Sequence, residues 1–250
     1  MRLDISLYSN ELKKSTQLCV LLPEGVQDAP CKVLWLLHGL TDDHTAWTRY
    51  TAIERYARDR RLAVVMPNAD RSWYTNTAYG ANYFNFITKE LPVLCRRHLC
   101  GLSEAREDNV IAGLSMGGYG ALKMALSCPE QYGACISLSG ALDITRKGRP
   151  CDIAEWRSLF GYELASPDDL GGSEHDLFTL ATQAKDKGLS LPRIAMWCGQ
   201  SDSLLRVNRD FDRHLTALGV AHTYEESEGD HSWRWWDLHL QRLLDRILTV

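Results

Sequence analysis

The sequence predicts an α/β protein with a mostly parallel, eight-stranded sheet that is flanked by helices. Apolar, β-rich runs alternate with helical stretches of roughly ten or more residues, which is the length that crossovers between parallel strands require. From the third run onward the segments are continuously hydrophobic, as expected for strands buried on both faces. The expected strands are Leu3–Tyr8, Gln17–Leu22, Lys32–Leu37, Leu62–Met66, Asn109–Leu114, Ala134–Leu138, Arg193–Cys198 and Ala221–Glu225.

Length and composition fit one large domain, and we expect a single domain over residues 1–250. The chain is 45% hydrophobic and 24% charged, with a formal net charge of −4. No basic block could track a phosphate backbone, so nucleic acid is not an expected partner. The N-terminus lacks a signal-peptide pattern and the apolar runs are too short to span a bilayer. We therefore expect a cytoplasmic protein without membrane association.

The alternation of strands and helices fails between Gly140 and Leu191, where glycines and prolines interrupt the pattern. We interpret residues 141–191 as an insertion at the edge of the sheet. Two interpretations are open: a helical excursion that covers core, or a small cap over the active site that contributes to a substrate pocket. In the second interpretation the substrate would contact bulky side chains of this segment, namely Trp156 and Phe160, together with Leu159 and Phe178.

The strand Asn109–Leu114 runs into the sequence Gly113-Leu114-Ser115-Met116-Gly117 and then into a helix of small residues. Strand, tight turn and helix form the pattern of a nucleophile elbow. A serine on such a turn is lifted clear of the sheet, and glycines two residues before and after it remove side chains that would collide with neighbouring backbone. Ser115 is therefore the predicted nucleophile.

A serine hydroxyl needs a base and a carboxylate, which should follow later in the chain at the same end of the sheet. Asp202 is the predicted acid, because it lies in the loop that leaves the carboxyl end of the strand Arg193–Cys198. Capping of the helix that begins near Leu204 is a compatible second role for this residue. His231 is the predicted base, since it lies between the last strand and the final helix. For the adjacent Asp230 we expect helix capping instead.

A tetrahedral oxyanion also needs two hydrogen-bond donors. The backbone amide of Met116, the residue after the nucleophile, supplies the first. The second is expected from the loop after the early strand, where His38-Gly39-Leu40 follows directly. Gly39 should let the backbone turn so that the Leu40 amide points into the site.

Other prominent residues carry weaker signals. Trp47 follows the oxyanion loop and is a candidate for substrate contact, although a packed helix explains it equally well. The tryptophans at 233, 235 and 236 stand at helical spacing beside leucines, which favours core packing. Ligand spacing such as HExxH is absent, so no metal or cofactor is expected. The eight cysteines are scattered without a CxxC pair, as in a chain with reduced thiols.

Four segments together resemble the putative-esterase family of α/β-hydrolases, with esterase D and tributyrin esterase as its nearest members. They are Leu37–Trp47, Met66–Tyr74, Gly113–Ala121 and Gly229–His231. The resemblance extends over nearly the whole chain and implies the α/β-hydrolase fold and an intracellular carboxylesterase for small esters with short acyl chains. It implies Ser115, Asp202 and His231 as the triad and the Leu40 and Met116 amides as oxyanion donors. It also implies a homo-oligomer, a dimer or a tetramer.

Several functions within and beyond this family remain open. The S-formylglutathione hydrolase branch carries a cysteine after the oxyanion glycine, and residues 40–47 have none, which counts against a thioester substrate. The alternatives are that thioesterase, a feruloyl or acetyl-xylan esterase, an acyltransferase, and a binding module without catalysis. An intact triad counts against the binding module. The alcohol half of the ester stays open, because the shape of the pocket depends on how the insertion folds.

Overall fold

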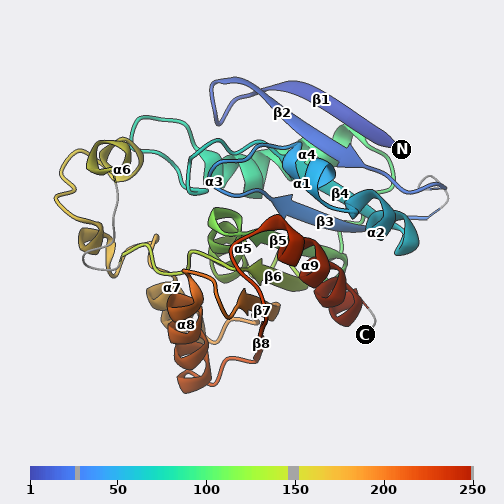
Figure 1. The fold of residues 1–250 in the computed structure, drawn as a ribbon. Helices are drawn as coiled ribbons and strands as arrows, with labels where there is room; N and C mark the ends of the chain where they lie inside the picture. Colours follow the sequence, from blue (N-terminus) through green and yellow to red (C-terminus); the bar gives the residue numbers. More distant parts are fainter. Residues whose placement is uncertain (26–28, 146–151, 249–250) are drawn as a thin grey trace.

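The computed structural model describes residues 1–25, 29–145 and 152–248. One sheet runs through the molecule in the strand order β1-β2-β4-β3-β5-β6-β7-β8 (Figure 1). All eight predicted strands are present, with boundaries within three residues of those expected. They are β1 Arg2–Ser9, β2 Lys14–Leu21, β3 Lys32–Leu37, β4 Leu62–Pro67, β5 Asn109–Leu114, β6 Ala134–Leu138, β7 Arg193–Gly199 and β8 His222–Ser227.

The direction of the strands confirms the predicted mostly parallel α/β architecture. Strands β3 to β8 are mutually parallel, whereas β1 and β2 form an antiparallel hairpin whose second strand pairs antiparallel with β4. The central strands β4 to β6 are buried on both faces. The expectation of full burial is wrong for β8, which is half exposed, because it is an edge strand of the sheet.

Helices cover both faces of the sheet and bury its alternating side chains in two hydrophobic clusters. Along β3, for example, Val33 and Trp35 belong to one cluster and Leu34 and Leu36 to the other. The second cluster packs under α1 Ala46–Tyr50, α2 Ile53–Asp59 and α9 Trp233–Leu248. The first packs under α4 Leu91–His98, α5 Met116–Ser127, α7 Leu177–Asp186 and α8 Leu205–Ala217. The shorter elements are α3 Tyr83–Asn85, η1 Phe86–Glu90, η2 Arg106–Asp108, α6 Ile153–Phe160 and η3 Pro167–Leu170.

The segment expected as an insertion divides into two parts. Helix α7 packs against α5 and contributes to the first cluster, so residues 177–186 cover core, as the first of the two interpretations expects. Before α7 the chain makes an excursion that carries α6, which lies beyond the end of the sheet toward which the parallel strands run (Figure 1). We name residues 152–176 the excursion. Residues 146–151 of the expected insertion lie outside the described residues.

Three further findings concern the described part of the chain only. None of its helices is long and apolar enough to cross a membrane. Seven of its cysteines are present as free thiols, and Cys151 lies outside the described ranges. Across the same residues, no three His, Cys, Asp or Glu side chains converge as ligands for a metal ion.

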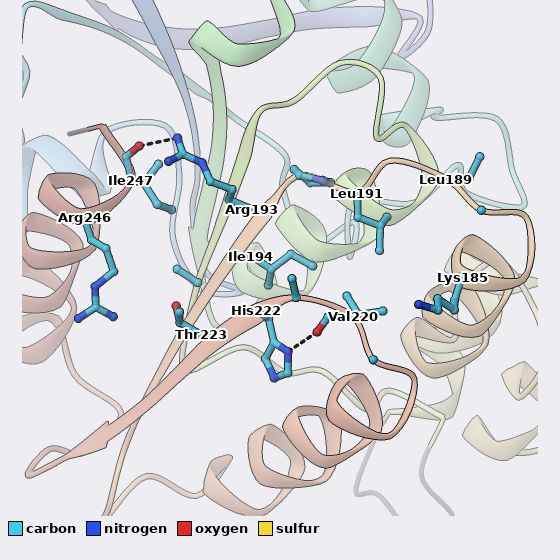
Figure 2. A pocket seen from close by; sticks show the side chains of 15 residues that line it. Lys185, Leu189, Leu191, Arg193, Ile194, Val220, His222, Thr223, Arg246 and Ile247 are labelled. Carbon is cyan, nitrogen blue, oxygen red and sulfur yellow. Dashed lines mark hydrogen bonds between the residues drawn. The ribbon is translucent and has the colours of Figure 1, made fainter. Parts of the chain in front are cut away.

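A cavity of about 730 Å³ lies where β7 and β8 begin, beside the ends of α7 and α9 (Figure 2). Two of its polar side chains are already engaged, since Arg193 donates to the Ile247 carbonyl at 2.6 Å and His222 bonds the Val220 carbonyl at 2.8 Å. The cavity lies at the amino ends of these strands, whereas Ser115 follows the carboxyl end of a parallel strand. The length of a strand such as β7, roughly 20 Å, therefore separates the two. This cavity is therefore remote from Ser115.

One charged side chain is buried inside the first cluster. Lys123 of α5 is only 3% exposed. Burial lowers the pKa of its amine from 10.5 to about 7, and the distant charge of Glu174 opposes this shift only in part. Because the unfolded chain holds this proton up to a much higher pH, unfolding takes up a proton at any pH between these two values.

The stability of the protein is therefore expected to rise with pH through this window. Between pH 7 and pH 8, where most free thiols are still protonated, Lys123 should add up to about 1 kcal/mol to the free energy of unfolding. The buried histidines contribute a smaller rise that is nearly complete by about pH 7.5, because free histidine titrates near pH 6.5. Urea unfolding at half-unit pH steps measures the slope. The variant Lys123→Met should flatten it, and parallel curves for the two proteins would contradict the assignment.

Candidate active site

The turn between β5 and α5 holds Ser115 in a conformation that few residues adopt. Its φ is +52° and its ψ −115°. A Cβ atom on Gly113 would lie 2.3 Å from the Gly117 carbonyl oxygen, and one on Gly117 would lie 2.5 Å from the Leu37 carbonyl oxygen. Both positions thus require glycine for close approach of backbone. The strain of roughly 1–3 kcal/mol at Ser115 is typical of a functional turn that its surroundings hold in place.

The structure brings the three residues Ser115, His231 and Asp202 together. The Ser115 Oγ lies 3.0 Å from His231 Nε2, and His231 Nδ1 lies 2.9 Å from one Asp202 oxygen and 3.1 Å from the other. Because an ionised carboxylate can only accept hydrogen bonds, Nδ1 must carry the proton and donate its hydrogen bond to Asp202. The other ring nitrogen, Nε2, is then free to accept a hydrogen bond from the serine hydroxyl. The imidazole is therefore oriented as a base toward Ser115.

The Asp202 carboxylate is fully buried but well satisfied. Burial alone would raise its pKa, yet hydrogen bonds from His231 and from the Leu204 amide lower the pKa overall below the usual value. The Leu204 amide donates to Oδ1 at 2.8 Å, one residue before α8 begins. Asp202 thus closes the turn into α8 and contacts His231 at the same time, so the two roles considered for it coexist.

Two residues close to Asp202 and His231 have contacts with the site that were not predicted from the sequence. Ser139 follows β6 with a φ of +46°, is fully buried, and its hydroxyl helps to lower the pKa of Asp202. Trp236 of α9 donates from Nε1 to Ser139 Oγ at 3.1 Å, and its ring meets the His231 ring edge-on with centroids 4.9 Å apart. The sequence could have pointed to Ser139 through its position, because this residue directly follows a buried strand at the same end of the sheet as Ser115.

Replacing Ser139 by alanine should therefore impair the site while the fold persists. The change removes a hydroxyl that supports a charged carboxylate, and such hydrogen bonds contribute about 1.5–3 kcal/mol. We expect kcat/KM to fall by about tenfold, with a lower Tm because the Trp236 N–H loses its acceptor. Steady-state kinetics of Ser139→Ala beside a thermal melt tests this. Wild-type kinetics in a folded variant would remove Ser139 from the site.

The loop after β3 is arranged around a neutral histidine. His38 Nε2 accepts from the Ala69 amide at 2.9 Å, so Nδ1 carries the proton and donates to the Gly39 carbonyl at 2.7 Å. Burial lowers the pKa of His38, which keeps it neutral. Because the carbonyl and the N–H of a trans peptide point in opposite directions, this bond turns the Leu40 amide away from His38. The role of His38 as an orienting residue was not predicted.

Gly39 allows its loop to approach the elbow closely, rather than making the turn that was expected of it. Its φ lies outside the left-handed region, so the turn itself does not need glycine. A Cβ atom there would lie 2.8 Å from a Leu114 methyl carbon and 3.8 Å from the Ser115 Cβ. The loop therefore passes directly beside the elbow at Gly39, the residue before Leu40. Met116 is the first residue of α5, so its amide has no carbonyl one turn earlier to bond.

Trp47, expected as a candidate for substrate contact, is corrected by the structure. It is fully buried, its Nε1 donates to the Leu37 carbonyl at 3.1 Å, and its ring packs edge-on against Trp233. The side chain of Trp47 is thus buried completely between α1 and α9, so none of its surface can contact a substrate. Core packing also holds for Trp236.

The aromatic residues of the expected cap are likewise placed differently. Trp156 is buried between Trp73 and Phe160, with ring centroids 5.8 and 5.0 Å away, so it packs the excursion and offers no open face. Phe178 packs edge-on against Phe211 between α7 and α8, so part of its ring belongs to the helical layer. Leu159 is buried, whereas Phe160 and Phe178 both keep a partly exposed surface.

Comparison with known proteins places the chain in a family. A family model described as "Putative esterase" matches residues 9–247. An acetyl esterase of Caldicellulosiruptor saccharolyticus is 32% identical over 262 residues, with 99% of this chain and 98% of that protein covered.

Solved structures give the same result. The substrate-bound fluorophosphonate-binding serine hydrolase F of Staphylococcus aureus has a TM-score of 0.92 at 33% identity, covering 100% of this chain and 99% of that one. An S-formylglutathione hydrolase of Staphylococcus aureus has a TM-score of 0.89 at 32% identity, with the same coverage. From the model match over almost the entire sequence and from these full-length relatives, the chain belongs to the putative-esterase family of α/β-hydrolase serine hydrolases and is a carboxylic ester hydrolase.

Proposed function

We propose that this protein hydrolyses short-chain acyl esters, with Ser115 as nucleophile, His231 as base and Asp202 as the acid that orients it. The observation that carries the proposal is the hydrogen-bonded series from Ser115 Oγ through His231 to Asp202 at a strained strand-to-helix turn. Such a series is the arrangement in which a serine hydroxyl becomes a nucleophile. The amides of Leu40 and Met116 are the proposed oxyanion donors.

The reaction follows from these positions. As Ser115 Oγ attacks the ester carbonyl, its proton moves to His231 Nε2, and the carbonyl electron pair moves onto the oxygen, which the two amides stabilise. Collapse of this intermediate breaks the bond to the alkoxide, which takes the proton from His231 and leaves as the alcohol. Water then attacks the acyl-enzyme with the same base, and the carboxylic acid departs as Ser115 recovers its proton.

The short acyl chain is proposed on two grounds. The full-length relative from Caldicellulosiruptor saccharolyticus is named for an acetyl ester substrate. The excursion also carries a dense aromatic layer, so that a long chain would have to displace packed side chains. Each methylene that fits the acyl site should make binding of the acyl chain more favourable by about 0.8 kcal/mol, whereas a methylene beyond the site should give no such gain.

Specificity should therefore rise from acetyl to about butyryl and fall by octanoyl. We expect this trend in kcat/KM over a series of nitrophenyl esters from two to twelve carbons, measured below the solubility limit of each ester. A maximum at eight carbons or more would indicate an open groove and would overturn the short-chain part of the proposal. The roles proposed for Ser115, His231 and Asp202 are tested separately by substitution.

A thioester substrate is the second candidate, and the similarity to an S-formylglutathione hydrolase supports it. The missing cysteine in residues 40–47 counts against it. Hydrolysis of S-formylglutathione and of a formyl oxygen ester by the same preparation distinguishes the two. We expect the oxygen ester to have the higher kcat/KM, and a preference for the thioester of tenfold or more would reverse the order of the candidates.

A further inference from the structure

The buried Lys123 links three segments of the chain. Its Nζ donates to Thr75 Oγ1 at 3.1 Å and to His175 Nδ1 at 3.1 Å, and it lies 5.5 Å from the centre of the Phe84 ring. Thr75 belongs to the loop after β4, and His175 belongs to the excursion. Lys123 itself lies on the nucleophile helix α5, eight residues after Ser115. We name Lys123, Thr75 and His175 the clasp.

Every hydrogen-bond partner of the clasp amine is neutral. Burial lowers the pKa of His175 to about 3, so its ring is uncharged, and within the described residues no carboxylate lies within 4 Å of Lys123. The nearest acid, Glu174, faces the other side of the His175 ring at 3.7 Å and is largely exposed. Fully buried lysines without an acidic partner are rare and costly, and an apolar residue would fill the same space without that cost. Unlike an apolar residue, a lysine at this position forms hydrogen bonds to two separate segments of the chain.

His175 is held by main chain as well as side chain. The Tyr119 hydroxyl, one turn before Lys123 on the same helix, donates to the His175 carbonyl at 2.9 Å. The Phe160 ring of α6 meets the His175 ring edge-on, with centroids 4.8 Å apart. Movement of His175 would therefore be passed directly to α6.

These contacts close a circuit of aromatic side chains beside the elbow. Tyr119 contacts Trp73 with ring centroids 5.8 Å apart, and from Trp73 the ring contacts continue through Trp156 and Phe160 back to His175. Tyr119 stands one helical turn after Ser115. The excursion that carries half of this circuit lies beyond the sheet end at which Ser115 is located (Figure 1).

We propose that Lys123 is a specificity-determining residue: the clasp fixes the excursion relative to Ser115 and so sets the length of acyl chain that the site accepts. Lys123 does this as a positioning residue, without contact with the reacting atoms. The inference rests on the proposed ester hydrolysis. It concerns how the preference for acyl-chain length differs between variants, and it holds whichever chain length the wild-type enzyme prefers.

The test compares four proteins on nitrophenyl acetate, butyrate and octanoate. Lys123→Met keeps the length and apolar stem of the side chain but removes both of its hydrogen bonds. Thr75→Val removes the bonds of Thr75 Oγ1 to Lys123 and to His175 Nδ1 with little change of shape. Lys89→Met, at an exposed lysine of η1, is the matched control. Thermal melts establish that each variant is folded.

We expect the ratio of butyrate to octanoate kcat/KM to change at least tenfold in Lys123→Met and about threefold in Thr75→Val, mainly through KM for octanoate. The kcat for acetate should stay within about threefold, and Lys89→Met should match the wild type. A folded Lys123→Met with an unchanged ratio overturns the inference, as does an equal loss of kcat on all three esters. If Lys123→Met does not fold, Thr75→Val decides, and an unchanged ratio there overturns the inference. A wild-type optimum at octanoate counts against the short-chain proposal alone.

Discussion

The variant Ser115→Ala is expected to remain folded and to lose about 10⁶-fold in kcat, as in hydrolases whose triad acts as one unit. The elbow keeps its geometry because its closest contacts are made by Gly113 and Gly117, and alanine only removes one oxygen atom at a backbone conformation that is already strained. His231 keeps its bond to Asp202 but has no hydroxyl to deprotonate. The covalent step therefore disappears without a packing defect.

The measurement is kcat on nitrophenyl butyrate, with circular dichroism and a thermal melt to establish the fold. Ser127→Ala, at the exposed end of the same helix, is the matched control and should keep full activity. Labelling with a fluorophosphonate probe gives an independent readout, because the probe needs the same hydroxyl. Activity above a tenth of the wild type in Ser115→Ala would show that another residue is the nucleophile.

Much of the fold and of the site follows from local sequence. A strand that runs into Gly113-Leu114-Ser115-Met116-Gly117 leaves few possible conformations, because only glycine avoids backbone at the two flanking positions. The parallel strands were predictable from their continuous apolar composition. Their shared direction places Ser115, Asp202 and His231, each after a different strand, at one end of the sheet. Their convergence was therefore predictable without knowledge of any tertiary contact.

The errors arise where burial depends on distant partners. Trp47 resembles a substrate-contacting residue in its local sequence, but Trp233 of α9 covers it from a position far along the chain. For residues 177–186 the sequence left open whether they cover core or form a cap, and the apolar surface of α5 draws them into the helical layer.

Buried polar residues escaped sequence analysis for a related reason. Lys123 lies in a helix of small and apolar residues, and nothing local distinguishes it from a solvent-exposed lysine. Its partners Thr75 and His175 come from two other segments, so the clasp exists only once the loop after β4 and the excursion meet α5. His38 was tied to the oxyanion loop from the sequence, but its orienting bond depends on the Ala69 amide, which fixes its tautomer.

The variant Asp202→Asn should lose about 10⁴-fold in kcat while its fold is retained. The side-chain amide of asparagine can donate to His231 Nδ1, which favours the tautomer with the proton on Nε2, and this nitrogen then cannot accept from Ser115. The variant also lacks the negative charge that stabilises the imidazolium formed during the reaction. Because the folded-state pKa of Asp202 is lowered, the carboxylate is ionised and the loss should be seen at neutral pH and above.

Asp230→Asn is the matched control, since Asp230 precedes His231 directly but bonds the Ser232 hydroxyl instead of the imidazole. We expect its kcat to stay within a few-fold of the wild type, because the bonds from Asp202 to His231 and to the Leu204 amide are unaffected. Both variants are compared by kcat at pH 8 and by urea unfolding. Near-normal turnover in Asp202→Asn, with a severe loss in Asp230→Asn, would assign the orienting carboxylate to Asp230. A severe loss in both variants would mean that neither of the two loops tolerates a change of charge, and would contradict the assignment of the orienting role to Asp202 alone.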